Sequence, residues 1–425
     1  MYRSLSSTFK SLHSRSYFHP SPFTFSTTKP KGMLDGVRVL DLSRILAGPY
    51  GTMLLADMGA EVIKVEPPEG DETRKWGPPF IGSDATYYFS INRNKKGLCL
   101  DLKKKQGLEV LYKLVEKSDV LVENFAPGVT DRLKIDYNTL SQINPGLIYA
   151  SLTAYGTTGP WASKPGFDMI NQAMSGLLHV TGHRDGPPAK VGVAVTDIIS
   201  GLTLNNGILA ALYEKKVTGK GKRIETSLME SMLSGLVNIW SAHLNGGADP
   251  QRNGNQHPSI APSGIYPTQE GKYIAIFCND KQFFGLCEAI GLENLKVDER
   301  YNTNKARVVN MKALEEILKE RIKQFKFDDV LKKLEEKRVP SGPVNSIKDV
   351  FESEHIIENE IVQKVDSEKY GELKLVRNPL KIDGEIFKDI EAPPAIGEHS
   401  EDVLKDVLRY TKDEIAKLRE GKVIP

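Results

Sequence analysis

Residues 37–66, VRVLDLSRILAGPYGTMLLADMGAEVIKVE, hold the pattern that decides the fold. VRVLDL (37–42) predicts a short strand, AGPYGTMLLADMGA (47–60) predicts a short helix, and EVIKVE (61–66) predicts a second strand. A strand, a helix and a strand in this order form a βαβ unit, whose two strands are parallel. No G-x-G-x-x-G follows the first strand, so the unit does not predict a dinucleotide site.

The same alternation of strands and helices continues through the first half of the chain. It predicts an α/β fold whose large domain has a Rossmann-like parallel sheet. The later segments of this pattern are LCLDL (98–102), a charged helix through LEVLYKLVEKS (108–118), DVLVENF (119–125) and LIYASLTAYG (147–156).

The second half of the chain predicts a smaller α+β domain. A stretch rich in Gly, Asn and Pro at 245–268 is typical of a long functional loop or a domain boundary. KYIAIFC (272–278) then predicts a strand, and charged amphipathic helices are expected at 280–291, 310–325 and 327–337. The expected organisation is a leader at 1–33, a large domain at 34–225, a small domain with a glycine loop at 226–345, and a linker and C-terminal segment at 346–425 that returns to the large domain.

The N-terminal segment has an unusual composition. Its first 34 residues contain no Asp or Glu, carry five Lys or Arg residues and are rich in Ser. This composition is typical of organelle transit peptides, and it predicts such a leader. A plain disordered tail is the alternative. Without these five cations the chain, whose net charge is +2, becomes weakly acidic, so nothing predicts nucleic-acid binding.

The remaining composition argues against several other classes. No run approaches 18 consecutive apolar residues, so no membrane span is predicted. The three cysteines, at positions 99, 278 and 287, lack C-x-x-C spacing and are expected to be reduced core residues. No HExxH motif or His/Cys cluster is present, so neither a metal site nor a bound cofactor is expected.

A single carboxylate, Asp197, lies in the otherwise apolar and small-residue run VGVAVTDIISGL (191–202). It stands just before an expected helix at 198–214, where the simpler interpretation is a helix cap. A cap does not exclude chemistry, because a helix dipole and free N–H groups lower a carboxyl pKa and keep the group ionised. A desolvated, ionised carboxylate is a usable nucleophile. The local pattern leaves both interpretations open.

Several stretches resemble the class III CoA-transferases of the formyl-CoA transferase and racemase superfamily. They follow in order over 34–425, and DETRKWGPPF, ATYYFSINRNKKG and VLKDVLRY are most similar to mitochondrial members that use dicarboxylic acids. The resemblance implies an interlocked homodimer in which each chain threads the other. The other matching stretches are DLSRILAGPYGTMLLADMGAEVIKVEPPEG, SDVLVENFAPG, YGTTGPWASKPGFDMINQAMSGL, VGVAVTDIISGL, VPSGPVN and PPAIGEHSEDVL.

The resemblance implies that Asp197 is the nucleophile, which forms acyl–aspartyl anhydride and aspartyl–CoA thioester intermediates. Asp168, in PGFDMINQA, is implied to be an auxiliary carboxylate beside it that tunes its charge, with an N-cap as the alternative. The family's mobile glycine loop corresponds to RNGNQHP (252–258), which an ordinary surface loop would also explain. The loop residues expected in the site are Gly254, Asn255 and Gln256.

The resemblance also implies contacts with the substrates. Arg44 follows the first strand, where it could clamp the distal carboxylate of a dicarboxylic acyl group; a surface Arg is the alternative. Pro67 replaces an Arg that contacts CoA in many relatives. The implied CoA-binding residues are Ile45, Ala47, Leu100, Lys103, Asn124, Phe125, Ala126 and Arg132.

We therefore expect a mitochondrial enzyme that transfers CoA from succinyl-CoA to glutarate or 3-hydroxy-3-methylglutarate. An acyl-CoA racemase is a weaker alternative, because Phe167 occupies the position of the His that serves racemase relatives as a base. A catalytically silent CoA-binding protein is a second alternative, and the presence of Asp197 and Gly254 argues against it. The expected partners are an acyl-CoA, a dicarboxylic acid and a second copy of the chain.

Overall fold

The computed structural model describes residues 32–425, so the predicted leader at 1–33 lies almost wholly outside the described residues. A six-stranded sheet forms the centre of the large domain, and every neighbouring pair of its strands is parallel. The expected α/β fold with a parallel sheet is therefore confirmed. In spatial order the strands are β5 (Lys95–Cys99), β2 (Glu61–Glu66), β1 (Arg38–Asp41), β6 (Val120–Glu123), β7 (Ile148–Thr153) and β8 (Arg223–Ser227).

The strand order creates a crevice at one edge of the sheet. From β1 the chain first moves outward through β2 to β5, and it then returns to the other side of β1 with β6. Connections that leave β1 and β6 therefore diverge at the carboxyl ends of these strands. In open α/β sheets, ligands bind at this switch point.

Helices cover both faces of the sheet, and residues alternate between two cores. Val39 of β1 packs with α1 (Ala47–Asp57) and α8 (Val195–Thr218) on one face. Leu40 packs on the opposite face with α3 (Lys105–Glu116) and the C-terminal α18 (Lys412–Glu420). Both residues are fully buried, as expected for a strand sandwiched between two helical layers.

Two glycines let α1 and α8 cross closely. A Cβ atom on Gly201 would lie 2.4 Å from the Ala47 carbonyl oxygen, and one on Gly51 would lie 2.9 Å from the Gly201 oxygen. This contact places the second turn of α8 against the start of α1. By length and composition alone α8 could cross a membrane, but it packs on α1 and the sheet, and core helices of this kind meet the same criterion.

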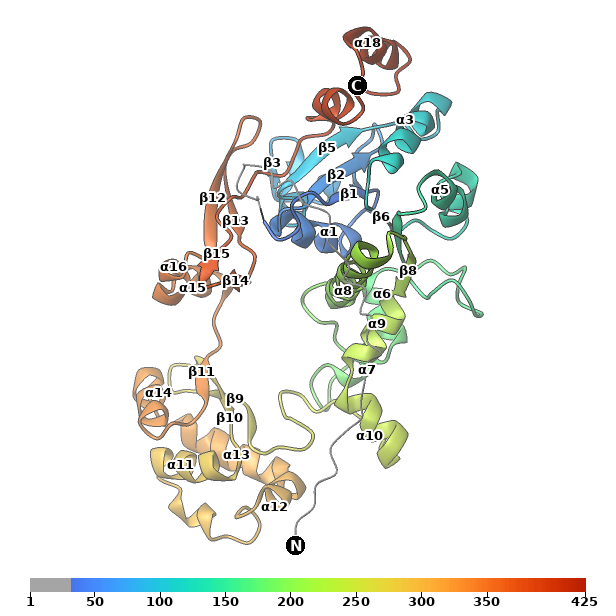
Figure 1. Cartoon of the computed structure of the whole chain (residues 1–425). Helices are drawn as coiled ribbons and strands as arrows, with labels where there is room; N and C mark the ends of the chain where they lie inside the picture. The colour runs from blue at the N-terminus through green and yellow to red at the C-terminus, as the bar shows by residue number, and fades with distance from the viewer. Residues whose placement is uncertain (1–31) are drawn as a thin grey trace, which may run out of the picture.

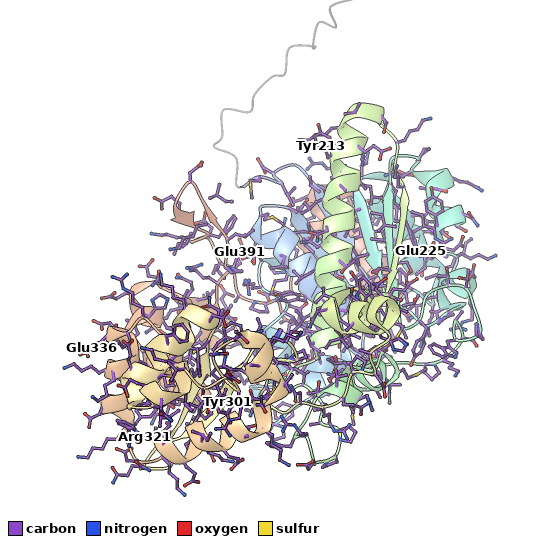
Figure 2. The ribbon with its side chains drawn as sticks, turned by 90° about the horizontal axis from the view of Figure 1, so that it is seen from below. Tyr213, Glu225, Tyr301, Arg321, Glu336 and Glu391 are labelled. Atoms are coloured by element: carbon purple, nitrogen blue, oxygen red, sulfur yellow. The ribbon has the colours of Figure 1, made fainter. Side chains whose placement is uncertain are left out.

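The small domain has its own sheet and core. The sheet is antiparallel and contains β9 (Ser263–Pro267), β10 (Tyr273–Phe277) and β11 (Ser341–Pro343). The helices that pack with it are α11 (Asp280–Ile290), α13 (Met311–Ile322) and α14 (Phe327–Glu336). Figure 1 shows this domain well separated from the large sheet and joined to it by two connectors on opposite sides. In Figure 2, the labelled Tyr301, Arg321 and Glu336 mark the small domain, while Tyr213 marks the far end of α8.

The outgoing connector contains α9 (Leu228–Gly235) and α10 (Asn238–Gly246), and the returning one leads to the hairpin of β12 (Val362–Ser367) and β13 (Gly371–Val376). The chain end then packs against β5. The Gly97 N–H donates to His399 Nδ1 (3.1 Å), and the Cys99 N–H donates to Ser400 Oγ (3.1 Å). All three cysteines are free and buried, as the sequence predicted.

Candidate active site

The switch point brings together residues that are far apart in the sequence. The Arg44 N–H donates to Asn124 Oδ1 (2.8 Å), and Asn124 Nδ2 donates back to the Arg44 carbonyl (2.8 Å). The Arg44 guanidinium lies over the Phe125 ring, 5.0 Å from its centroid. Its Nη1 is 3.3 Å from Glu72 Oε1 in an exposed ion pair. Arg44 therefore lies at the rim of the crevice, with 38% of its side chain accessible to solvent.

Helix α8 begins at Val195, three residues earlier than the sequence predicted, so Asp197 is its third residue. The N-cap residue is Ala194, which offers no side-chain acceptor. The cap interpretation of Asp197 is therefore wrong. The capping group is Asp168 instead, whose Oδ1 accepts from the Thr196 N–H (2.9 Å) and the Thr196 hydroxyl (2.8 Å).

Asp168 does not cap its own helix either, because it is the first residue of α6 (Asp168–Met174) and Phe167 is the N-cap. Its second oxygen accepts from Gln172 Nε2 (2.7 Å), and Gln172 Oε1 accepts from the Val191 N–H (2.9 Å). Gln172 thus ties Asp168 to the segment that leads into α8. Sequence reasoning did not single out Gln172, and no local pattern distinguishes it from other helical glutamines.

The carboxyl of Asp197 has a strongly perturbed proton affinity. Burial, and next the negative charge of Asp168, raise the pKa of Asp197 from 3.8 to about 7. The expectation that the helix terminus keeps this pKa low is wrong, because desolvation and the neighbouring carboxylate dominate. Strong perturbation of this kind, at the carboxyl edge of a parallel sheet, is typical of functional sites.

Tyr87 belongs to the same electrostatic environment. It lies in α2 (Thr86–Phe89), and its pKa rises to about 12 through burial and then the charges of Asp197, Asp168 and Asp71. Its ring meets Trp76 edge to face, with centroids 5.7 Å apart. The stretch ATYYF contributed to the family resemblance, but sequence reasoning assigned no role to this tyrosine.

The glycine-containing loop lies against the segment that precedes α8. The Gly254 N–H donates to the Gly182 carbonyl (3.2 Å), and Arg184 Nη2 donates to Asn253 Oδ1 (3.1 Å). Gly254 has a φ of +62°, which a glycine adopts without strain. Asn255 is exposed, whereas Gln256 is buried.

The implied CoA-binding residues lie along one edge of the sheet. Ile45 and Ala47 follow β1, and Asn124, Phe125 and Ala126 follow β6 beside a cavity of about 250 Å³ that Phe125 and Ala126 help to line.

The other implied residues lie farther along the same edge. Leu100 and Lys103 follow the outermost strand β5, with β2 between them and Arg44. The Leu100 side chain is buried in the core, so only its backbone is available to a ligand. Arg132 is exposed on α4 (Val129–Leu133).

The fold and the site together define an α/β enzyme class in which a partly buried carboxylate stands at the edge of a Rossmann-like sheet. A profile of CoA-transferase family III matches residues 34–400. The chain belongs to this family and is a class III CoA-transferase.

Individual relatives of known activity or structure are consistent with membership of this family. A mouse succinyl-CoA:glutarate CoA-transferase is 39% identical over 91% of this chain and 88% of its own length. A succinate–glutarate CoA-transferase from Agrobacterium fabrum is 39% identical over 89% of this chain and 96% of its own. Among solved structures, a CAIB/BAIF family protein from Brucella suis is 40% identical, with a TM-score of 0.79 over 88% of this chain and 99% of its own.

Proposed function

We propose that this enzyme transfers CoA from succinyl-CoA to glutarate, and that 3-hydroxy-3-methylglutarate is a further acceptor. One observation carries the proposal: Asp197 is a partly buried carboxylate in the first turn of α8, one turn before Gly201, and Gly201 lies against the first turn of α1, which follows β1 at the carboxyl edge of the sheet. The mouse and Agrobacterium relatives, both CoA-transferases named for succinate or succinyl-CoA and glutarate, support these acids as substrates. The sequence stretches most similar to mitochondrial succinate–hydroxymethylglutarate CoA-transferases support the second acceptor.

Carboxylate chemistry supplies a balanced route. An Asp197 oxygen attacks the succinyl thioester carbon, which forms a succinyl–aspartyl anhydride and releases CoA thiolate. The thiolate attacks the aspartyl carbonyl, which gives an aspartyl–CoA thioester and free succinate. The acceptor carboxylate then attacks this thioester, forms a second anhydride and releases the thiolate again. Attack of the thiolate on the acceptor carbonyl yields the new acyl-CoA and regenerates Asp197.

The neighbours of Asp197 suit these steps. The nearby charge of Asp168 disfavours the ionised form of Asp197 and so raises the reactivity of the carboxylate once it forms. The loop at Gly254 would protect the anhydrides from water by covering the site, and its backbone N–H groups would stabilise the oxyanions once the Gly254 N–H leaves the Gly182 carbonyl. Arg44, at the rim beside Asn124, would hold the distal carboxylate of the dicarboxylic acyl group.

The CoA moiety would lie along the loops after β1, β5 and β6, in contact with the residues implied by the family resemblance. Two copies would interlock through the space that each chain encloses between its two connectors (Figure 1). The acid-free N-terminal composition supports import into mitochondria.

The racemase alternative lacks support at Phe167, which precedes Asp168, is largely exposed and cannot accept a proton. A silent CoA-binding protein would not need a carboxyl whose pKa lies near 7.

The test compares wild type with Asp197→Asn after incubation with succinyl-CoA and trapping by hydroxylamine or borohydride. We expect mass modification of the peptide containing VAVTDIISG in the wild type alone. Modification elsewhere, or CoA exchange by Asp197→Asn at the wild-type rate, would overturn the assignment.

A further inference from the structure

The loop between β1 and α1 holds a residue in an unusual backbone conformation. Ile45 has a φ of +68°, in the left-handed region that β-branched residues rarely occupy. Backbone strain of this kind persists only where the surroundings impose it, and it clusters at functional sites. Ile45 lies between Arg44 at the rim of the crevice and the first turn of α1.

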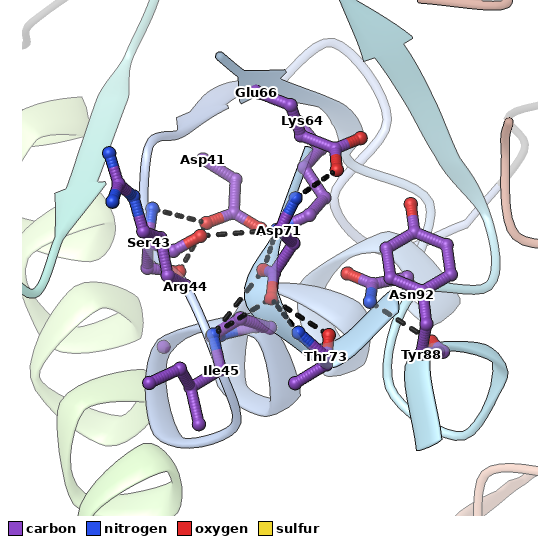
Figure 3. Close-up of polar contacts among 12 residues, drawn as sticks. Asp41, Ser43, Arg44, Ile45, Lys64, Glu66, Asp71, Thr73, Tyr88 and Asn92 are labelled. Atoms are coloured by element: carbon purple, nitrogen blue, oxygen red, sulfur yellow. Dashed lines mark hydrogen bonds and ion pairs between the residues drawn. The ribbon is translucent and has the colours of Figure 1, made fainter. Parts of the chain in front are cut away.

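A buried ion pair contacts this loop from the side of β2. Lys64 Nζ and Asp71 Oδ2 are 3.0 Å apart, and each side chain is 1% exposed. Asp71 accepts from the Ile45 N–H at 3.3 and 3.4 Å, while Lys64 Nζ donates to the Ser43 carbonyl (3.1 Å). Figure 3 shows both side chains reaching the loop, Lys64 toward Ser43 and Asp71 toward Ile45.

Other side chains also form hydrogen bonds with the backbone of this loop or orient Asp71. Asp41 Oδ1 accepts from the Ser43 N–H (3.0 Å), and Asn124 pairs with both backbone groups of Arg44. Thr73 orients Asp71 through its N–H (2.9 Å) and its hydroxyl (2.8 Å). Side chains from three other segments therefore hold the backbone of Ser43, Arg44 and Ile45.

The charges of this pair persist despite their burial. Burial alone would raise the pKa of Asp71, but Lys64 and the Thr73 hydrogen bonds lower it. Burial would likewise lower the pKa of Lys64, yet the carboxylates of Asp71, Asp41 and Glu66 raise it. An apolar pair would fill this interior as well, so stability alone does not account for the two charges.

We propose that Lys64 and Asp71 are positioning residues for CoA transfer: they hold Ile45 in its left-handed conformation and thereby set the loop that presents Arg44 and the start of α1 to the acyl-CoA. This inference rests on the proposed function for the identity of the ligand. Neither residue touches the reacting atoms. Their effect on the reaction passes through the backbone of residues 43–46.

The test is a double-mutant cycle between Asp71→Asn and Ile45→Gly, with the dissociation constant for succinyl-CoA as the readout. Binding is measured in proteins that also carry Asp197→Asn, so that no transfer occurs. A glycine adopts positive φ without strain and needs no anchor. We expect Asp71→Asn to weaken succinyl-CoA binding at least tenfold in the protein that keeps Ile45, and less than threefold in the Ile45→Gly protein.

A matched control separates positioning from stability. Asp57 forms a similarly buried pair with Arg93 (Oδ1 to Nε, 2.9 Å), away from this loop. Asp57→Asn should lower the Tm while the dissociation constant stays within twofold of its parent. If Asp71→Asn does not fold, Thr73→Val replaces it in the cycle, because it removes one hydrogen bond to the Asp71 carboxylate without removing a charge. Thr73→Val should weaken succinyl-CoA binding less than Asp71→Asn does. Its effect should also be smaller in the Ile45→Gly protein than in the protein that keeps Ile45.

Two results would overturn the inference. One is an equal effect of the Asp71 substitution in both backgrounds, which would make the pair a general structural element. The other is unchanged affinity in a folded Asp71→Asn or Thr73→Val protein. Failure of the Asp197→Asn parent itself to bind succinyl-CoA would instead count against the proposed function.

Discussion

Asp168 Oδ1 accepts two hydrogen bonds from Thr196, from its N–H at 2.9 Å and from its hydroxyl at 2.8 Å. One carboxylate thus caps helix α8 and also places a negative charge beside Asp197, the next residue along that helix. The cap fixes the first turn of α8, and the charge raises the pKa of Asp197. The two effects can be separated by substitution.

Asp168→Ala should destabilise the protein by about 1 kcal/mol, because the free Thr196 donors lose their acceptor. Asp168→Asn should lose less, since its side-chain oxygen still accepts. The measurement is the free energy of unfolding by denaturant for both variants. Equal losses would show that the charge of Asp168, and not its acceptor oxygen, stabilises the helix.

Asp168→Asn should slow transfer yet still form the covalent adduct, and it should shift the pH dependence. In the wild type, the rate of adduct formation should rise with pH through about 7, as Asp197 ionises. Removal of the neighbouring charge lowers the pKa of Asp197, so the same rise should occur at lower pH. Rapid-quench kinetics between pH 5 and 9 measure both profiles. A profile that does not move, or wild-type turnover at all pH values, would return Asp168 to a purely capping role.

Asp197 should also make stability depend on pH. The folded carboxyl keeps its proton up to about pH 7, whereas an unfolded one loses it near 3.8. Between these values the folded state binds more protons, so its free energy of unfolding falls as pH rises. Asp197→Asn removes this penalty and should be more stable than the wild type by about 1–2 kcal/mol at pH 8, given partial exposure. The two proteins should converge near pH 4, and a difference that does not change with pH would contradict the raised pKa.

Arg44→Ala should impair dicarboxylic acyl groups selectively. A substrate carboxylate that loses its guanidinium partner should bind about 10- to 100-fold more weakly, whereas acetyl-CoA has no such group to lose. The ratio of kcat/KM for succinyl-CoA to that for acetyl-CoA measures the selectivity. Arg300→Ala, which removes an exposed Arg–Asp pair in the small domain, is the control and should leave the ratio unchanged. Equal losses for both substrates would assign Arg44 to CoA binding or to the structure of the loop.

Gly201→Ala should displace the N-terminal part of α8. Its new Cβ would lie 2.4 Å from the Ala47 carbonyl, a backbone atom that cannot simply rotate away. We expect a loss of about 2 kcal/mol or more in stability and a lower rate of adduct formation, because Asp197 moves with the helix. Gly246→Ala, also in a helix but with open space around it, should be neutral or stabilising. Wild-type activity in a folded Gly201→Ala protein would show that the close crossing does not position Asp197.

Local sequence information was sufficient for the architecture. The alternation of β-rich and helical runs predicted the parallel sheet, because each run depends on side chains close together in the chain. Placement of Arg44 directly after the first strand also predicted which edge of the sheet would carry the candidate site, since parallel sheets bind ligands at the carboxyl ends of their strands.

By itself the sequence therefore determined the parallel α/β architecture, the edge that carries the site, and Asp197 as a carboxylate in need of explanation. The tertiary structure alone decided which groups surround that carboxylate. The Thr196 N–H donates to Asp168, which is 28 residues away in the sequence, and the Ile45 N–H donates to Asp71, which is 26 residues away. Desolvation and charge–charge interactions act through space, so no local pattern reports them. For that reason the start of α8 and the raised pKa of Asp197 both differed from expectations based on neighbouring residues.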